Sequence, residues 1–312
     1  MNKLLCLTLL ALCAMPSFVA APDTLPPPNP PGVPPVPYEG DARPYADSPY
    51  AAHIDKAINY LYYDRTPDRW PALALLDFLQ RKFGLDRRYT HANMFSPQMQ
   101  ALADTKDLSI MGRLVDPSHQ YDPSAFKVDN WTFRAMVQVL YCDRFPLPDD
   151  FTRTLFDKIA ALDKADRTPF ENLEAAVLGR VLVWGAENGC VSADTPQFGE
   201  ARDKLAAILR KILLDNGPTG MIGCQAITTL DYLGKRKLVD KDWLDALATT
   251  QLSNGGWSQS KTDRKNTDSH TTALALWALL EHSMPTAPKV PMIPQPPGGE
   301  GGGENAAPPS SE

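Results

Sequence analysis

A histidine, a cysteine and several amides and carboxylates stand where helices are expected to begin. One set is Asp268-Ser269-His270, and an earlier one is Cys224-Gln225. An imidazole can transfer protons in catalysis, and a thiolate and an imidazole together are ligands that zinc accepts. These residue types therefore indicate acid–base chemistry or metal binding, provided that the fold brings them to one place.

Further polar and aromatic residues occupy the starts of the preceding expected helices. They are Asp129, Asn130, Trp131, Arg134, Glu171 and Asn172, and Trp257 stands shortly before the last helix. Asparagine and arginine can neutralise a substrate carboxylate, and an indole ring can stack on a sugar. Asp129, Glu171 and Asp268 can equally be ordinary helix caps, because a side-chain oxygen there accepts a hydrogen bond from a backbone N–H group.

Helical patterns dominate the chain between residues 45 and 284, and the alternation typical of strands is scarce. Many of the expected helices follow Asp, Asn, Ser or Thr, as helix starts prefer. The expected helices span residues 50–63, 70–83, 96–105, 131–142, 149–162, 169–184, 196–214, 221–233, 241–251 and 267–282. The sequence therefore predicts an all-α protein.

Two kinds of helix alternate in this region. The helices at 149–162, 196–214 and 241–251 are charged on one side and apolar on the other, as expected of outer helices. The helices between them are apolar or small nearly all round, which predicts that protein surrounds them.

The starts of the apolar helices recur at a regular interval. They lie near residues 130, 172, 222 and 269, which are 42, 50 and 47 residues apart. This spacing indicates an array of helix pairs. If the inner helices run parallel, their unpaired N–H groups and positive dipole ends lie at one mouth, and the polar residues named above converge there.

Gln251, Gly255 and Trp257 fit the Q-x-x-x-G-x-W core of the QW repeat, and this segment resembles the α/α-toroid superfamily. Triterpene cyclases, protein prenyltransferase β subunits and complement-type thioester domains belong to that superfamily. The resemblance implies an (α/α) toroid-like barrel of about five helix pairs, with the chemistry at the mouth formed by the inner-helix starts. An open α-solenoid with a period nearer to about 34 residues is the alternative.

The catalytic motifs of that superfamily are incomplete here. In prenyltransferase β subunits a D-x-C pair and a later histidine hold zinc, and this chain has Ile222 in place of the aspartate, with Cys224 and His270 matching the other two ligands. Two ligands are too few for a zinc site, so we predict neither a metal nor a cofactor. The D-x-D-D acid of the cyclases and the C-G-E-Q sequence of the thioester domains have no match.

The leading functional prediction is a non-catalytic binding or scaffold module that takes a small molecule, a glycan or a protein at the mouth. The alternative is a carbohydrate-active enzyme, a polysaccharide lyase or glycoside hydrolase, that uses His270 at the same mouth.

The two ends of the chain predict its location and its flexible parts. Residues 1–21 resemble a secretory signal, with Lys3 before an apolar run that is too short to span a membrane, so we predict a secreted or periplasmic protein. Residues 22–44 and 285–312 are rich in proline and poor in large apolar groups, which predicts disordered segments around a folded domain at 45–284. The net charge of −6 argues against nucleic acid as a partner.

Three cysteines remain once the signal segment is removed. Cys142 ends one expected inner helix and Cys190 follows the end of the next, so both lie at the C-terminal end of the barrel, whereas Cys224 lies at the opposite mouth. The repeat register therefore predicts a disulfide between Cys142 and Cys190 and a free thiol at Cys224.

Overall fold

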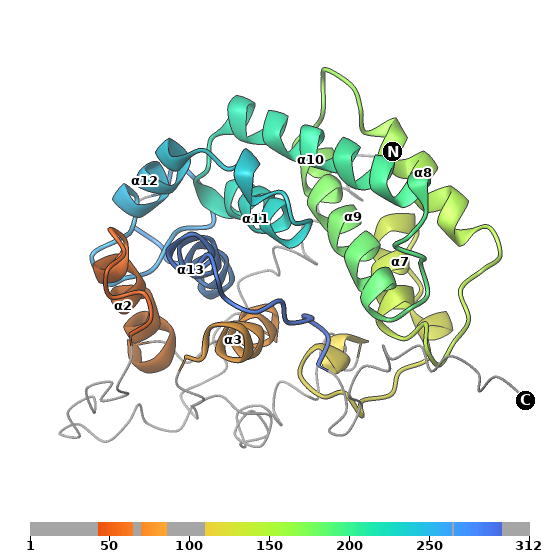
Figure 1. Cartoon of the computed structure of the whole chain (residues 1–312), viewed down its shortest axis with the longest axis horizontal. Coiled ribbons are helices and arrows are strands. Elements are labelled where there is room, and N and C mark those ends of the chain that lie inside the picture. Colours follow the sequence, from red (N-terminus) through yellow and green to blue (C-terminus); the bar gives the residue numbers. More distant parts are fainter. Residues whose placement is uncertain (1–42, 65–69, 86–109, 264, 295–312) are drawn as a thin grey trace, which may run out of the picture.

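The computed structural model describes residues 43–64, 70–85, 110–263 and 265–294 (Figure 1). Within these ranges the regular elements are helical, and extended backbone pairs only in one isolated bridge between Trp257 and Asp268. The all-α prediction is confirmed. None of the helices in the described ranges is both long and apolar enough to cross a membrane.

The helices begin and end close to the residues expected from the sequence. The α-helices are α2 (Ala51–Asn59), α3 (Trp70–Phe83), α7 (Trp131–Leu140), α8 (Phe151–Ala161), α9 (Pro169–Glu187), α10 (Pro196–Asn216), α11 (Gly220–Tyr232), α12 (Lys241–Thr249) and α13 (Ser269–Ser283). A π-helical segment, η1 (Tyr60–Asp64), continues α2, and short 3-10 turns are η2 (Gly112–Leu114), η3 (Pro123–Ala125) and η4 (Arg236–Leu238). The helix expected at 96–105 lies outside the described residues.

Side-chain caps explain why several helices start where they do. The Asn130 side chain accepts a hydrogen bond of 3.0 Å from the backbone N–H of Phe133, and Asp268 accepts one of 2.8 Å from Thr271. Thr168 and Glu171 form a reciprocal capping box at the start of α9. Each cap satisfies a backbone donor that has no partner within the helix, which fixes the first turn.

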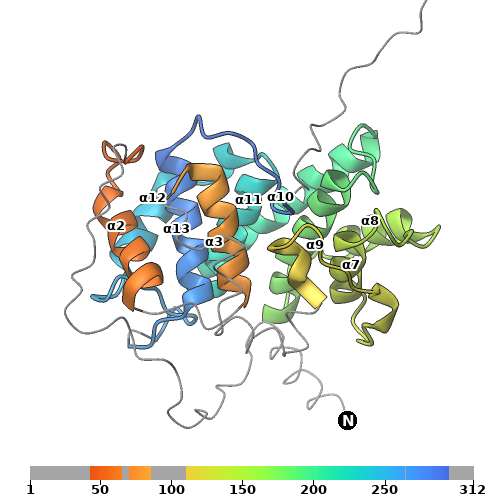
Figure 2. The same ribbon diagram turned by 90° about the horizontal axis from the view of Figure 1, so that it is seen from below.

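The helices of the C-terminal region form two layers. Helices α7, α9, α11 and α13 pack side by side in chain order, and we call them, together with α3, the inner helices (Figures 1 and 2). The outer helices α8, α10 and α12 pack against this row. Helix α13 also contacts both α2 and α3, so the last helix of the chain touches the first two described.

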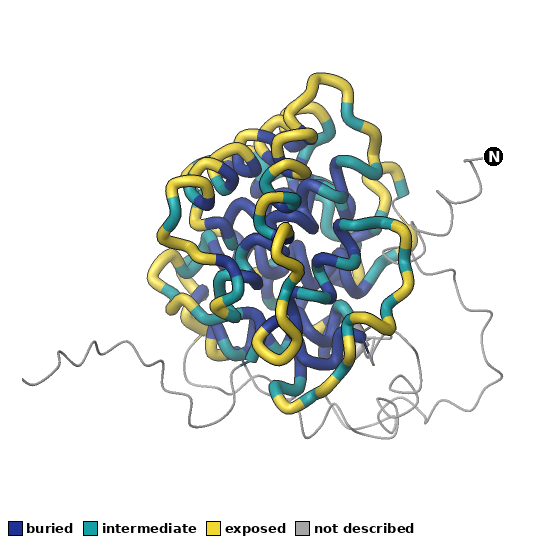
Figure 3. The backbone as a smooth tube through the Cα atoms, turned by 90° about the vertical axis from the view of Figure 1, so that its right-hand side faces the viewer, coloured by how far each residue is buried: buried dark blue, intermediate teal, exposed yellow. Residues whose placement is uncertain are grey.

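Burial follows the predicted alternation. Every residue of α13 from Ser269 to Glu281 is buried, as a helix that is apolar all round requires. The indole of Trp277 meets the ring of Phe78 in α3 edge to face at 4.9 Å and that of Tyr232 in α11 at 5.8 Å. Figure 3 shows the buried parts of the backbone in the interior, surrounded by intermediate and exposed segments.

The inner helices run in the same direction. Contacts between their C-terminal ends join neighbours pair by pair: Asn188 with Val139 (2.6 Å), Tyr232 with Glu187 (2.6 Å), His282 with Asp231 (3.2 Å) and Lys82 with Glu281 (2.6 Å). These contacts connect α9 to α7, α11 to α9, α13 to α11 and α3 to α13. Because the C-terminal ends meet, the N-terminal ends lie at the opposite end of the row.

The folded part extends beyond the domain expected at 45–284. Residues 285–294, which the sequence assigns to a disordered tail, pack onto the helices, and Met292 and Ile293 are 2% and 0% exposed. Because the segment is rich in proline, its composition did not indicate that this aliphatic pair would be buried. The burial of the pair anchors the segment to the helices. The predicted signal segment at 1–21 and nearly all of the linker at 22–44 lie outside the described residues.

Candidate functional site

The start of α7 borders an open depression of about 440 Å³. Its lining includes two of the residues singled out from the sequence and is formed by Pro123, Ser124, Phe126, Lys127, Val128, Asp129, Arg134 and Gln138. The Arg134 guanidinium donates to the carbonyl oxygens of Val128 at 2.7 Å and Asp129 at 3.3 Å, so it holds the loop that forms one wall. Lys127 and Arg134 give this depression two cationic groups.

Asn130 joins the starts of α7 and α9. Besides capping α7, it donates through its side-chain amide to the carboxylate of Glu174 at 2.8 Å, and Thr132 donates to the same oxygen at 3.2 Å. The sequence indicates Glu174 as an acidic residue that favours the start of this helix, but Glu174 was not among the residues predicted for the site. This polar contact positions two neighbouring inner helices.

The side chains of Trp131 and Glu171 contact neighbouring elements of the fold rather than a shared opening. The Trp131 ring packs on Phe151 of outer helix α8, with ring centroids 5.5 Å apart. Glu171 accepts a hydrogen bond of 2.6 Å from the Lys164 ammonium, which lowers the pKa of this carboxyl, with further help from Thr168. Both residues therefore contribute to helix packing and capping.

Asn172 is buried at the start of α9 and is held by an arginine that the sequence analysis missed. Its side-chain oxygen accepts a hydrogen bond of 3.2 Å from Arg167, which also donates to the backbone of Lys164 at 2.7 Å. Arg167 directly precedes the cap residue of α9, and this proximity in sequence is the signal that could have identified it.

Cys224 is fully buried in the first turns of α11. Burial raises the pKa of its thiol to about 12, and the negative charge of Asp268 acts in the same direction. The thiol is therefore neutral at physiological pH, whereas nucleophilic attack and metal binding both require the thiolate. The effect of Asp268 also places the starts of α11 and α13 within electrostatic reach of each other.

Gln225 and His270 are also buried at these helix starts, at 2% and 8% exposure. The side-chain oxygen of Gln225 has no hydrogen-bond partner among the described residues. Leaving a buried acceptor without a partner costs about 1–3 kcal/mol. Gln225 is therefore a residue whose side chain a polar ligand could satisfy.

Trp257 belongs to the core. It is 1% exposed, its indole N–H donates to the carbonyl of Leu247 at 2.8 Å, and its backbone N–H donates to Thr272 at 2.9 Å. Trp257 thus connects α12, through its ring, to α13, through its backbone.

The other QW-like residues connect the same region to α2. Gln251 donates to the backbone oxygens of His53 and Gly255, each at 2.9 Å. Gly255 has a φ of 90°, and a Cβ added there would lie 2.3 Å from the backbone oxygen of Lys56. The glycine therefore allows this turn to approach α2 more closely than any other residue could.

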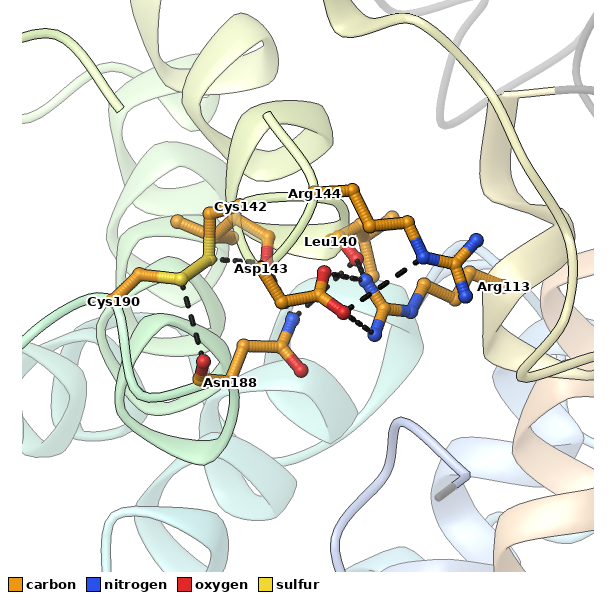
Figure 4. Close-up of a disulfide and its surroundings, with 8 residues drawn as sticks. Arg113, Leu140, Cys142, Asp143, Arg144, Asn188 and Cys190 are labelled. Atoms are coloured by element: carbon orange, nitrogen blue, oxygen red, sulfur yellow. Dashed lines mark hydrogen bonds and ion pairs between the residues drawn. A yellow bond between two sulfur atoms is a disulfide. The ribbon is translucent and has the colours of Figure 1, made fainter. Parts of the chain in front are cut away.

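The disulfide joins the C-terminal ends of α7 and α9 (Figure 4). Cys142 and Cys190 are bonded with their Cα atoms 6.2 Å apart, and Cys224 is the free cysteine among those described. This is the pairing that the repeat register predicts. Beside it, the buried Arg113 pairs with Asp143 at 2.7 Å, an interaction that the sequence did not indicate.

The C-terminal ends of the inner helices hold a buried ionic cluster that the sequence analysis did not include. Glu281, 2% exposed, pairs with Lys82 at 2.6 Å and with Arg236, and it accepts a hydrogen bond of 3.2 Å from the Trp277 indole. Asp231 is also buried, which raises its pKa, and His282 opposes this shift from 3.2 Å away.

Glu187 completes this cluster. Burial raises the pKa of its carboxyl to about 7, against the opposing effects of the Tyr232 hydroxyl, the Met292 backbone and Arg81. Acidic residues near the C-termini of α9, α11 and α13 are unfavourable with respect to the helix dipole. Their recurrence was the signal in the sequence that could have revealed the cluster.

No group of three or more His, Cys, Asp or Glu side chains in the described ranges is arranged to hold a metal ion. Comparisons with protein-family models, with curated proteins and with solved structures found no match.

Proposed function

We propose that this protein is an exported, non-catalytic binding or scaffold module of the α/α-toroid type, with its ligand site at the N-terminal ends of the inner helices. The ligand is a small molecule, a glycan or a protein segment that offers a hydrogen-bond donor. The observation that carries the proposal is the buried side-chain oxygen of Gln225, which has no partner among the described residues.

The contact between α3 and α13 supports a ring over an open solenoid. In a solenoid each repeat touches only its neighbours, so the first and last units stay apart. Here α13, the last inner helix, packs on both α2 and α3, and the QW-like segment adds the hydrogen bond from Gln251 to His53. A ring of parallel helices places their N-terminal ends around one opening.

The chemistry at those helix starts favours binding over catalysis. Cys224 is a neutral thiol, Trp257 is enclosed in the core, and Asp268 caps α13 through Thr271. Side chains already engaged in capping and packing cannot move to a substrate without loosening the helix starts.

A panel of neutral and acidic oligosaccharides tests the proposal, with binding measured by calorimetry and cleavage measured by new reducing ends or unsaturated products. We expect saturable binding without products. The variant Gln225→Leu keeps the side-chain size and removes the unpaired acceptor, so it should weaken binding about tenfold, which is about 1.4 kcal/mol, without lowering stability. Product formation that disappears in His270→Ala would favour the carbohydrate-active enzyme instead.

A further inference from the structure

Residues 285–294, here named the C-terminal strap, cross the C-terminal end of the inner helices. The strap leaves α13, passes the ends of α3 and α11 and continues toward α9 (Figures 1 and 2). Its first residue is fixed by Arg236, which donates to the carbonyl of Pro285 at 3.0 Å. This end of the helix row is opposite to the proposed ligand mouth, so the strap is independent of that proposal.

Side chains from three inner helices bind the backbone of the strap. Arg81 of α3 donates to the carbonyls of Pro291 and Met292, both at 2.8 Å. The Tyr232 hydroxyl of α11 accepts a hydrogen bond of 3.3 Å from the backbone N–H of Met292. The backbone N–H groups of Met292 and Ile293 also face the carboxylate of Glu187 in α9.

This arrangement has the features of a peptide-binding site. It binds donors and acceptors of an extended backbone, and it buries two adjacent aliphatic side chains, Met292 and Ile293. Backbone contacts give affinity for any extended segment, while the buried side chains select the sequence. Arg81 is held in place by Asp77 at 2.8 Å, so its two donors are positioned independently of the strap.

The chain contains the strap's pattern a second time. Residues 290–294 read VPMIP and residues 33–37 read VPPVP, so Val, Pro, a β-branched residue and Pro recur at matching positions. Residues 33–37 have carbonyl groups at the two positions that match those bound by Arg81 in the strap. The backbone N–H of Val36 matches that of Ile293. They lack the N–H that Met292 donates to Tyr232, because Pro35 stands there.

The N-terminal segment enters the fold close to the strap. Ser48 and Ser283 are joined by a hydrogen bond of 2.6 Å, and the strap begins directly after α13. Six residue steps separate Pro37 from Arg43, the first described residue, and an extended chain covers about 20 Å in that number of steps. The described chain therefore begins near the end of α13 from which the strap starts.

We propose that the site formed by Arg81, Glu187 and Tyr232 is an exchangeable peptide-binding site, and that residues 33–37 are its second occupant. When 33–37 binds, the strap and the residues after it are released. The site therefore couples the two ends of the chain, because only one VPx(V/I)P segment can be bound at a time.

Hydrogen exchange on the full mature chain tests this exchange. In Ile293→Asp the strap loses its anchor, and the backbone N–H of Val36 should become at least about tenfold better protected than in the unaltered chain. Adding Val36→Asp should remove that gain, and Arg81→Lys, which keeps the pairing charge for Asp77, should reduce it. A folded Ile293→Asp chain without protection at Val36 overturns the proposal.

A second measurement decides the matter if Ile293→Asp does not fold. A peptide of residues 31–39 is added at millimolar concentration to the unaltered chain, with the same peptide carrying Val36→Asp as the control. Faster exchange at Met292 and Ile293 with the first peptide only is the expected result. Equal exchange with both peptides overturns the proposal.

Discussion

The hydroxyl of Tyr232 donates a hydrogen bond of 2.6 Å to the carboxylate of Glu187, and this contact joins the ends of α11 and α9 beneath the C-terminal strap. Burial raises the pKa of Glu187 to about 7 and that of Tyr232 well above its usual range. The ends of two inner helices are therefore linked through a carboxyl whose charge state changes near neutral pH.

Stability should fall as the pH rises through this range. The pKa of the Glu187 carboxyl is about 7 in the folded chain, against a usual value of 4.5. Its contribution to the free energy of unfolding is therefore fully present below pH 4.5 and is lost as the pH rises to 7. The loss is roughly 3 kcal/mol at most. Denaturant unfolding at pH 5 and pH 8 measures it, and Glu187→Gln should reduce the difference between the two. An unchanged difference in that variant would assign the pH dependence to other groups, Asp231 first.

Removing Lys82 should destabilise the protein more than removing Arg236. Both pair with the buried Glu281, but the side chain of Lys82 is 10% exposed and that of Arg236 is 29% exposed. Breaking a buried ion pair on one side costs about 3–5 kcal/mol, and the remaining partner lowers this cost. We expect about 2–4 kcal/mol for Lys82→Met and about 1 kcal/mol for Arg236→Met in denaturant unfolding. The reverse order would contradict the arrangement of the cluster.

The disulfide should contribute about 4 kcal/mol, because it closes a loop with a sequence separation of 48 residues. The double variant Cys142→Ser, Cys190→Ser tests this in thermal or denaturant unfolding. Cys224→Ala is the matched control, since it removes a buried cysteine and leaves the bridge intact. Peptide mapping without reduction that places Cys224 in a bridge would contradict the helix register.

Gly255→Ala should be more damaging than Gly234→Ala, although both glycines have positive φ values, 90° and 73°. A Cβ at Gly255 would meet the backbone of Lys56 at 2.3 Å, whereas nothing lies within 4 Å of a Cβ at Gly234. The backbone strain alone costs about 1–2 kcal/mol, and the clash adds to it only at Gly255. Equal losses in unfolding experiments would show that α2 is not held against this turn.

Local signals explain why the helices and the disulfide could be predicted. Caps such as Asn130, Thr168 and Asp268 lie within three residues of the backbone groups they satisfy, and an apolar helix reveals its burial by composition. The pairing of Cys142 with Cys190 then follows from counting repeats. These features depend on short stretches of chain.

The direction of individual side chains and the long-range contacts could not be predicted in this way. Trp131 stands at a helix start like its neighbours, yet its ring packs on Phe151 of an outer helix. Lys82 and Glu281 come from opposite ends of the chain, so only the packing of α3 on α13 brings them together. The packing of the strap was not predicted because the segment contains many prolines and only two large aliphatic residues that become buried, Met292 and Ile293.

We propose a binding module whose ligand contacts Gln225. The most direct test is calorimetric titration of the mature protein with any oligosaccharide that binds, followed by product analysis of the same sample. We expect saturable binding that is about tenfold weaker in Gln225→Leu at unchanged stability, and no cleaved product. Cleavage that is abolished by His270→Ala, or binding that is unaffected by Gln225→Leu, would contradict it.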